Sequence, residues 1–482
     1  MSIQGPGVID VQTADDSQSL LPMKSRVIHK FYEPLVFLKA LNLEMVDAAT
    51  YISPSEPDHF QDPQTLFETF VYKLSHVCDS VKGEGGGTIT SIAVLQQEGN
   101  RTIEYLFGSN QRTEQELKAT ASYMRSLLQT VGEAPAQPFQ RNHATQKILL
   151  RAVLLFNRRR ISVYLRTLWI EAQKCLDGPP PPGVDDNLRD CEVVIRHLAK
   201  LSKTSAGQHI DRLARNVRGR TMKDSMVCWP ELRHMINRLL AYRHSVEFFL
   251  LAKDTWPQLF RDFQVFYIPS SQPMAKPTRQ KSLTAESIVG RMTRKEKDIK
   301  IFRNFAAELQ LFGLDDRIKT EYENENFRPI VHSEVLLLDW IHWNGGLEPA
   351  RFFQGWKYIG TSKPTCKLCH YYFQEHQSDV RHRSSHGNLY VNWRVPDVLK
   401  SQCPEAEEKR QVMVDRVIIR IRKDAFDLVK KRVKPTYRSH DSITSSARLT
   451  LQLTSDADDA ASRMAVFGIS DDDDENEGGA ML

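Results

Sequence analysis

Residues 331–341 read VHSEVLLLDWI, and residues 356–373 read WKYIGTSKPTCKLCHYYF. The first stretch predicts an apolar helix whose first turn carries a His-x-Glu pair. The second predicts a strand over 356–362 that leads into a helix starting near Thr365, with Cys-x-x-Cys in its first turn. The order of helix, strand and helix predicts an α/β fold centred on residues 326–435.

Four residues of these two stretches, the His-x-Glu pair and the two cysteines, have the chemistry of a metal centre. Cys366 and Cys369 lie three positions apart, so in a helix both sulfurs face the same side. The helix N-terminus favours the thiolates that zinc requires, and His332 would add a nitrogen ligand. Three protein ligands leave one tetrahedral position for water, which is typical of catalytic zinc sites. Glu334 would lie beside the metal as a proton shuttle without binding it.

His-x-Glu followed by a Cys-x-x-Cys helix resembles the zinc-dependent nucleobase deaminases. The wider text, VHSE at 331–334, TSKPTCKLC at 361–369 and WRVPD at 393–397, resembles a deaminase group that is expanded in fungi and related to bacterial toxin-type (OTT-type) deaminases. One departure is that Pro364 does not directly precede Cys366, as the proline does in the usual pattern.

The resemblance implies a cytidine-deaminase-like fold, in which a mixed sheet lies between helices in three α/β/α layers. It implies a Zn²⁺ ion on His332, Cys366 and Cys369, with Glu334 as the catalytic acid and base. The expected reaction is hydrolytic removal of an amine from cytosine C4 or adenine C6. The expected partner is a nucleobase-containing substrate, either a nucleoside, a nucleotide or a single-stranded nucleic acid; the oligomeric state is left open.

A β-hairpin is predicted within residues 83–110. Residues 88–95 are rich in β-branched side chains, residues 102–107 alternate polar and apolar, and a Gly-Asn turn lies between them. In the superfamily that the chain resembles, the second strand of such a hairpin often ends in an asparagine that contacts the substrate sugar, and Asn110 matches that position. Asparagine after a strand is also an ordinary turn residue.

The remaining chain is expected to be mainly helical between two disordered ends. A large all-helical insertion would separate the hairpin from the deaminase core. The expected segments are a disordered start (1–24), an N-terminal helical segment (25–82), the hairpin (83–110), the insertion (111–325) with a linker near 269–282, the core (326–435) and a disordered acidic tail (436–482).

Bulk composition narrows the class of protein. The net charge is only +5 for 65 basic and 60 acidic residues, which permits a nucleic-acid partner without requiring one. Seven scattered cysteines do not form a disulfide framework. The N-terminus lacks the pattern of a signal peptide, and no apolar run is long enough to span a membrane. These features predict an intracellular protein, cytoplasmic or nuclear.

Two alternatives use the same cysteines. Cys366, Cys369, His382 and His386 have the spacing of a DNA-reading zinc finger, although this assignment leaves His332 and its neighbouring glutamate without a role. The second alternative is a zinc-stabilised binding or regulatory module without catalytic activity. In every reading the aromatic residues near the site, such as those at positions 356, 358 and 393, are expected to be core residues.

Overall fold

A computed structural model of the chain describes residues 20–44, 62–81, 86–96, 102–135, 142–176 and 224–431, with scattered residues between 197 and 210. The acidic tail expected at 436–482, and the expected disordered start up to residue 19, lie outside the described residues.

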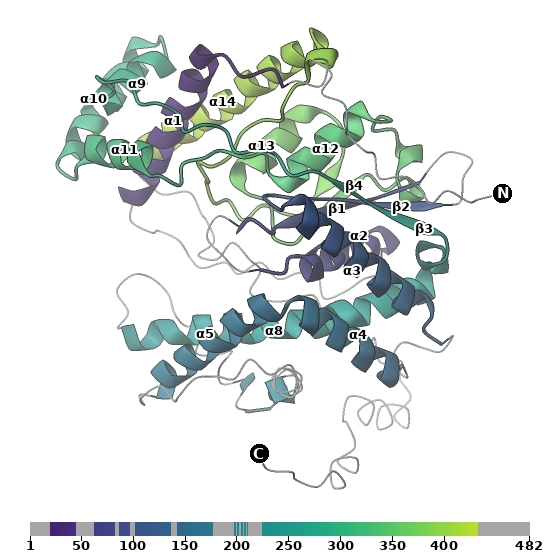
Figure 1. The fold of residues 1–482 in the computed structure, drawn as a ribbon. Coiled ribbons are helices and arrows are strands. Elements are labelled where there is room, and N and C mark those ends of the chain that lie inside the picture. Colours follow the sequence, from purple (N-terminus) through teal and green to yellow (C-terminus); the bar gives the residue numbers. More distant parts are fainter. Residues whose placement is uncertain are drawn as a thin grey trace.

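A mixed five-stranded sheet lies at the centre of the fold (Figure 1), with the strand order β3-β2-β1-β4-β5. Strand β1 runs antiparallel to both of its neighbours, whereas the two outer pairs, β2 with β3 and β4 with β5, are parallel. The expected hairpin is formed by β1 and β2, with Ile92 opposite Phe107. The strands are β1 (Thr90–Gln96), β2 (Ile103–Ser109), β3 (Phe263–Ile268), β4 (Tyr358–Thr361) and β5 (Arg381–His382).

The alternation of side chains along β1 creates two separate hydrophobic cores. Ala93 and Leu95 point into one core, whereas Ile92 and Val94 point into the other. Both faces of the central strand are therefore apolar and need a covering layer of helices. The α/β fold with helices on both faces of a mixed sheet is confirmed.

The face of the sheet that carries Ala93 is covered by helices from both ends of the described chain (Figure 1). These helices are α1 (Ser25–Glu44), α9 (Ala285–Met292), α10 (Glu296–Gln310), α11 (Leu314–Glu323), α12 (Ser333–Trp343), α13 (Lys367–His376) and α14 (Glu405–Lys431).

The opposite face is covered by α2 and α3, and further helices pack behind these two (Figure 1). The helices on this side are α2 (Pro63–Cys78), α3 (Glu114–Gly132), α4 (His143–Phe156), α5 (Arg158–Leu176) and α8 (Asp224–Thr255).

The segment 111–325 differs from the expected all-helical insertion. Its residues Phe263–Ile268 form strand β3, which extends the sheet beyond β2. This strand has only six residues and comes soon after the long helix α8, so its sequence pattern is difficult to separate from the helical periodicity that precedes it. The helices of the segment also divide between the two faces, because α9, α10 and α11 share the core of α1 and α14.

Residues 269–282 contain neither helix nor strand, as expected for a polar break. They are nevertheless bonded to the rest of the protein. The Met274 N–H donates to Pro329 O at 2.8 Å, and the Val331 N–H donates to Ser271 Oγ at 2.9 Å. The segment therefore lies along the chain that enters α12.

Candidate metal centre

Helix α12 begins beside the end of the β-hairpin. His332 is its N-cap residue, and Ser333 donates its backbone N–H to Asn110 Oδ1 at 2.9 Å. Further along, Leu337 packs so tightly over Gly108 that a Cβ on that glycine would lie 2.7 Å from the leucine Cδ1. A side chain at position 108 would force Leu337 to move, so the glycine lets α12 pack closely on the sheet.

Helix α13 begins at the second half of the site. Cys366 is its N-cap residue, and its Sγ accepts the backbone N–H of Cys369 at 3.4 Å. The short loop from β4 is held by a bridge between Thr365 and Ser385. The expected order of helix, strand and helix therefore brings the two helix N-termini together at one edge of the sheet.

The three expected ligands meet at this point. His332 Nδ1 lies 3.6 Å from Cys366 Sγ and 3.4 Å from Cys369 Sγ, and the two sulfurs are 3.4 Å apart. A tetrahedral zinc ion, with bonds of about 2.3 Å to sulfur and about 2.0 Å to nitrogen, separates such ligand atoms by about 3.5–3.8 Å. The donor set and its spacing therefore fit zinc. Within the described part of the chain, this is the one group of three or more His, Cys, Asp or Glu side chains close enough to share an ion.

Glu334 lies next to this group without belonging to it. Its side chain is only 3% exposed. Its carboxylate contacts the thiol of Cys369, and Ser333 Oγ lies 3.5 Å from its Oε2. The carboxylate therefore lies beside the group formed by His332, Cys366 and Cys369.

The two thiols titrate very differently. Burial opposes ionisation of Cys366, but the hydrogen bond from Cys369 and the charge of His332 hold its pKa well below the usual range. Burial and the neighbouring Cys366 thiolate raise the pKa of Cys369 well above that range. Burial alone would lower the pKa of His332, yet the Cys366 thiolate raises it. The three side chains therefore already favour one thiolate and a positive charge, and a divalent cation can replace the protons.

Asn110 lies at the expected position, at the end of β2, but its amide already has two partners within the protein. Besides accepting the Ser333 N–H, it donates from Nδ2 to Gly86 O at 3.2 Å, and the residue is 2% exposed. These bonds hold the start of α12 against the hairpin.

The zinc-finger set is not assembled. His382 lies on β5, where its Nε2 is 3.4 Å from His370 Nδ1, and its Nδ1 lies 2.7 Å from the carbonyl oxygen of Arg383. His386 Nδ1 accepts the backbone N–H of Asn388 at 3.0 Å. Neither histidine belongs to the cysteine group among the described residues, and β5 is part of a central sheet rather than of a finger hairpin.

Sequence reasoning missed one direct neighbour of the ligands. Trp393, expected to be a core residue, is fully buried, and its indole Nε1–H donates to Cys369 Sγ at 3.2 Å. Nothing in the spacing of the two residues predicts this contact, because it depends on how the chain after β5 folds back beside residue 330.

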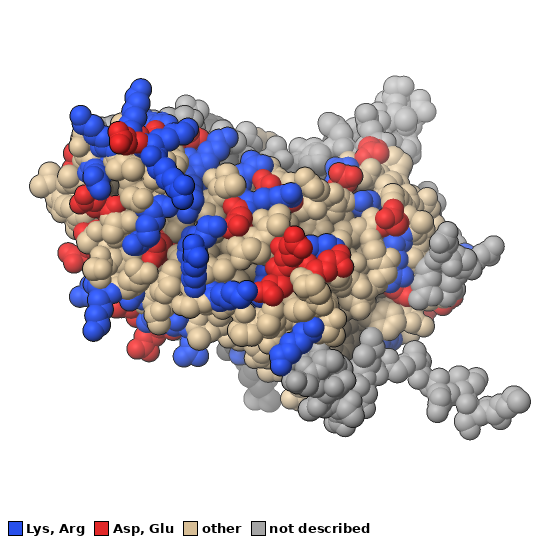
Figure 2. All heavy atoms as spheres, turned by 90° about the horizontal axis from the view of Figure 1, so that it is seen from above, with Lys and Arg blue, Asp and Glu red and all other residues tan. Residues whose placement is uncertain are grey.

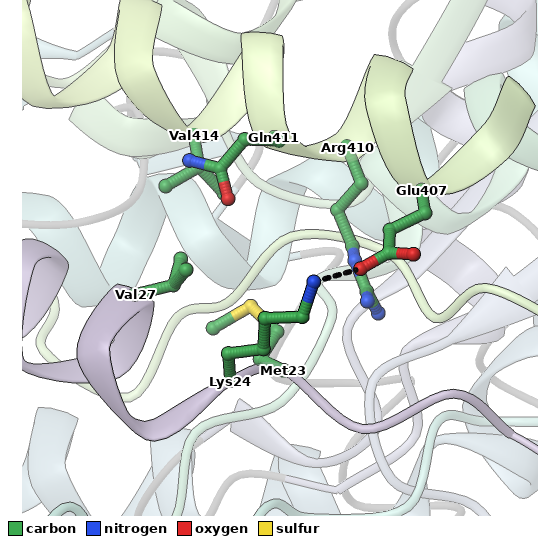
Figure 3. Close-up of a pocket in the computed structure, with 7 residues that line it drawn as sticks. All are labelled: Met23, Lys24, Val27, Glu407, Arg410, Gln411 and Val414. Atoms are coloured by element: carbon green, nitrogen blue, oxygen red, sulfur yellow. Dashed lines mark ion pairs between the residues drawn. The ribbon is translucent and has the colours of Figure 1, made fainter. Parts of the chain in front are cut away.

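A small hollow lies between the start of α1 and α14 (Figure 3). It is lined by Met23, Lys24, Val27, Glu407, Arg410, Gln411 and Val414. An ion pair of 2.9 Å between Lys24 and Glu407 crosses it. None of its lining residues belongs to the cysteine group, so it is separate from the candidate metal centre.

None of the helices in the described part of the chain combines the length and the apolar character needed to cross a membrane.

Comparison with known proteins relates this region to one family. Residues 331–397 match the model of the OTT_1508-like deaminases. Neither the curated proteins nor the solved structures contain a match to the chain. The matched segment begins just before His332, includes both cysteines and ends just after Trp393. Residues 331–397 are thus similar to the OTT_1508-like deaminases, which confirms the relationship to the deaminase superfamily that the motifs indicate.

Proposed function

We propose that this chain is a zinc-dependent hydrolytic deaminase that acts on the exocyclic amine of a cytosine or adenine base. One observation carries the proposal: an imidazole and two thiols lie 3.4–3.6 Å apart, beside a buried carboxylate that is not one of them, within a deaminase-like segment. Three protein ligands leave one position of a tetrahedral ion for water. A closed structural site would have a fourth protein ligand instead.

His332, Cys366 and Cys369 would hold the ion. When bound, zinc supplies a Lewis acid that makes water a nucleophile near neutral pH. Glu334 takes one proton from the attacking water and gives it to the ring nitrogen as the hydroxyl group adds to the ring carbon. It then takes the remaining proton of that hydroxyl group and gives it to the amine, which departs as ammonia while the carbonyl forms. Because Glu334 is only 3% exposed, bulk water competes little for that proton.

Access to the site is expected from the side of the histidine. His332 is partly exposed, whereas Cys366 and Cys369 are 4% and 0% exposed. We propose that the base enters over the imidazole and that Asn110 contacts the sugar. The Asn110 Nδ2 has two hydrogens, of which Gly86 O takes one, so the second can be donated to a sugar oxygen.

The substrate is a nucleoside, a nucleotide or a base in single-stranded nucleic acid, and a base within a duplex would first have to be flipped out. The face in Figure 2 offers no uniformly basic track for nucleic acid, because acidic side chains are interspersed with the basic ones. Basic side chains are also paired within the protein, as Lys30 is with Asp415 at 2.6 Å. Both ligand thiols must stay reduced, which favours a cytoplasmic or nuclear location.

The test combines zinc analysis of the purified chain with ammonia release from a panel of nucleosides, nucleotides and single-stranded DNA and RNA. The wild type should hold one zinc ion and release ammonia from at least one substrate. Glu334→Gln should keep the zinc and lose turnover, because the residue is not a ligand. His332→Ala should lose the zinc, whereas the control His382→Ala should retain it. Zinc without ammonia release from any member of the panel would favour the non-catalytic, zinc-stabilised module.

A further inference from the structure

One fully buried residue bonds to both halves of the candidate metal centre. The Trp393 side chain is 0% exposed, and its Nε1–H donates to Cys369 Sγ at 3.2 Å. The indole has a single N–H and no acceptor, so a buried tryptophan must find one acceptor or lose that hydrogen bond. Here the acceptor is the sulfur of an expected metal ligand.

The backbone around the same residue is paired with the chain that leads into α12. Trp393 forms a parallel bridge with Ile330, two residues before His332. The Arg394 N–H donates to Ile330 O at 2.9 Å, and the Ile330 N–H donates to Asn392 O at 3.2 Å. A shift of residues 392–394 would therefore move the histidine side of the site and the cysteine side together.

Contacts from α1 hold the tryptophan in this position. Its ring stacks on Phe31, with the centroids 5.8 Å apart, and its carbonyl oxygen accepts the Tyr32 O–H at 3.1 Å. The next residue, Arg394, bonds Asp397 through two hydrogen bonds of 2.6 and 2.8 Å. These contacts leave the Trp393 side chain little freedom to adopt another rotamer, so they keep its N–H directed at the Cys369 sulfur.

We propose that Trp393 is a positioning residue of the metal centre, which fixes the Cys369 thiolate through its indole N–H and keeps His332 in register through its backbone. This inference rests on the proposed zinc site. A donor to the sulfur stabilises its negative charge in a site where water is excluded, and it restricts the rotamer of the cysteine. Outer partners of this kind typically change metal affinity by about 10–100-fold.

The test is the zinc affinity of the full chain, measured by competition with a chromophoric chelator. Trp393→Phe keeps an aromatic ring and removes the donor, so it should weaken zinc binding by about 10–100-fold. The matched control is Trp256→Phe, because Trp256 is also buried, at 7% exposure, but packs among Phe67, Phe353 and Trp356 in the opposite core. The control should bind zinc as the wild type does.

A second variant addresses the case in which Trp393→Phe does not fold. Site-specific replacement of Trp393 by benzothienylalanine keeps the two-ring shape and replaces the N–H by sulfur. It should also weaken zinc binding, by at least about tenfold. Wild-type affinity in this variant, or in a folded Trp393→Phe, would overturn the positioning role, as would a wild-type chain that binds no zinc. A wild-type chain that binds zinc more tightly than Trp393→Phe but deaminates nothing would overturn the proposed function and leave the positioning role intact.

Discussion

Ser333 donates its backbone N–H to Asn110 Oδ1 at 2.9 Å, although the two residues are far apart in the sequence. The bond joins the end of the hairpin to the first turn of α12, one residue from His332 and one from Glu334. An N–H at the start of a helix has no partner within the helix and needs another acceptor. The N-cap residue His332 makes no capping bond with its side chain, and Asn110, just after β2, supplies the acceptor instead. The histidine is thereby free to face the cysteines.

We expect Asn110→Ala to destabilise the chain by about 1–3 kcal/mol, because it leaves the buried Ser333 N–H without an acceptor. Asn110→Asp keeps an acceptor for that N–H but loses the donor to Gly86 O and any donor to a sugar. It should therefore be more stable than Asn110→Ala and still show a raised KM. Thermal unfolding and steady-state kinetics of both variants check this. An aspartate variant with wild-type KM would remove Asn110 from substrate binding.

The parts of the site that local patterns determine could be predicted from the sequence. The apolar run after Glu334 and the Cys-x-x-Cys spacing each specify a helix start with its polar residues on one side. The two motifs therefore predicted the group of side chains that could hold a metal ion. Which of the candidate histidines lies beside the cysteines depends on the sheet. Strand β4 ends just before α13, whereas His382 lies on β5, the edge strand.

Contacts that depend only on tertiary pairing could not be predicted. The bond from Trp393 to Cys369 requires residue 393 to run beside residue 330, and no periodicity encodes such a pairing. The same holds for β3, which is a strand because the free edge of β2 accepts it, from Ile103 opposite Phe263 to Gly108 opposite Ile268. Its side chains are largely half-buried, so its burial pattern alone does not distinguish it from a helix end.

Removal of the proposed zinc ion should destabilise the folded chain. The site joins α12 to α13 through His332, Cys366 and Cys369, so zinc bound to the native state adds stability in proportion to the logarithm of its concentration over its Kd. At a free zinc concentration of 100 times the Kd, this amounts to about 2.7 kcal/mol. Calorimetry should show a lower Tm after chelation and recovery on adding zinc. Cys366→Ser should show little further loss on chelation, whereas an equal response in the wild type and the serine variant would place the metal elsewhere.

Asp339 should make stability fall as the pH rises. Burial raises its pKa to about 7, with the bond from Trp343 opposing and the charge of Asp397 adding to the shift. In the unfolded chain an aspartate titrates near pH ~3.9. Between about pH 4 and 7, Asp339 is therefore protonated in the folded state and ionised in the unfolded state. The stability that this proton contributes is complete below about pH 4 and is lost as the pH rises through 7.

Asp339→Asn removes this charge at every pH. Because the carboxyl is partly accessible to solvent, we expect Asp339→Asn to raise the free energy of unfolding at pH 8 by about 1–2 kcal/mol. The full pKa shift of Asp339 would imply a larger value. The gain should vanish near pH 4, which serves as the internal control. Urea unfolding at both pH values measures it. If the free energies of unfolding of variant and wild type differed by the same amount at both pH values, the Asp339 carboxyl would not have a shifted pKa.

Tyr164 should make stability rise with pH, which is the opposite of the effect of Asp339. Its Oη accepts hydrogen bonds from Arg160 Nε at 2.7 Å and from Arg238 Nη2 at 2.6 Å, in a buried position. Burial alone would raise its pKa, but the two guanidinium groups outweigh burial and lower it to about 8. An unfolded tyrosine titrates near pH ~10, so the stability that comes from its ionisation is present above pH ~10 and is lost as the pH falls through about 8.

A spectroscopic titration tests this assignment directly. The wild type should gain the absorbance of one tyrosinate near pH 8, well below its other tyrosines, and Tyr164→Phe should abolish that step. Tyr242→Phe is the matched control, because Tyr242 lies in the same buried cluster but burial and the neighbouring Tyr164 raise its pKa, so the step should persist. Tyr164→Phe also deprives two buried guanidinium groups of an acceptor. We therefore expect it to lower the free energy of unfolding by about 2–4 kcal/mol, and this loss should grow between pH 8 and 10. A step that survives in Tyr164→Phe would assign it to another residue and remove the pH dependence expected here.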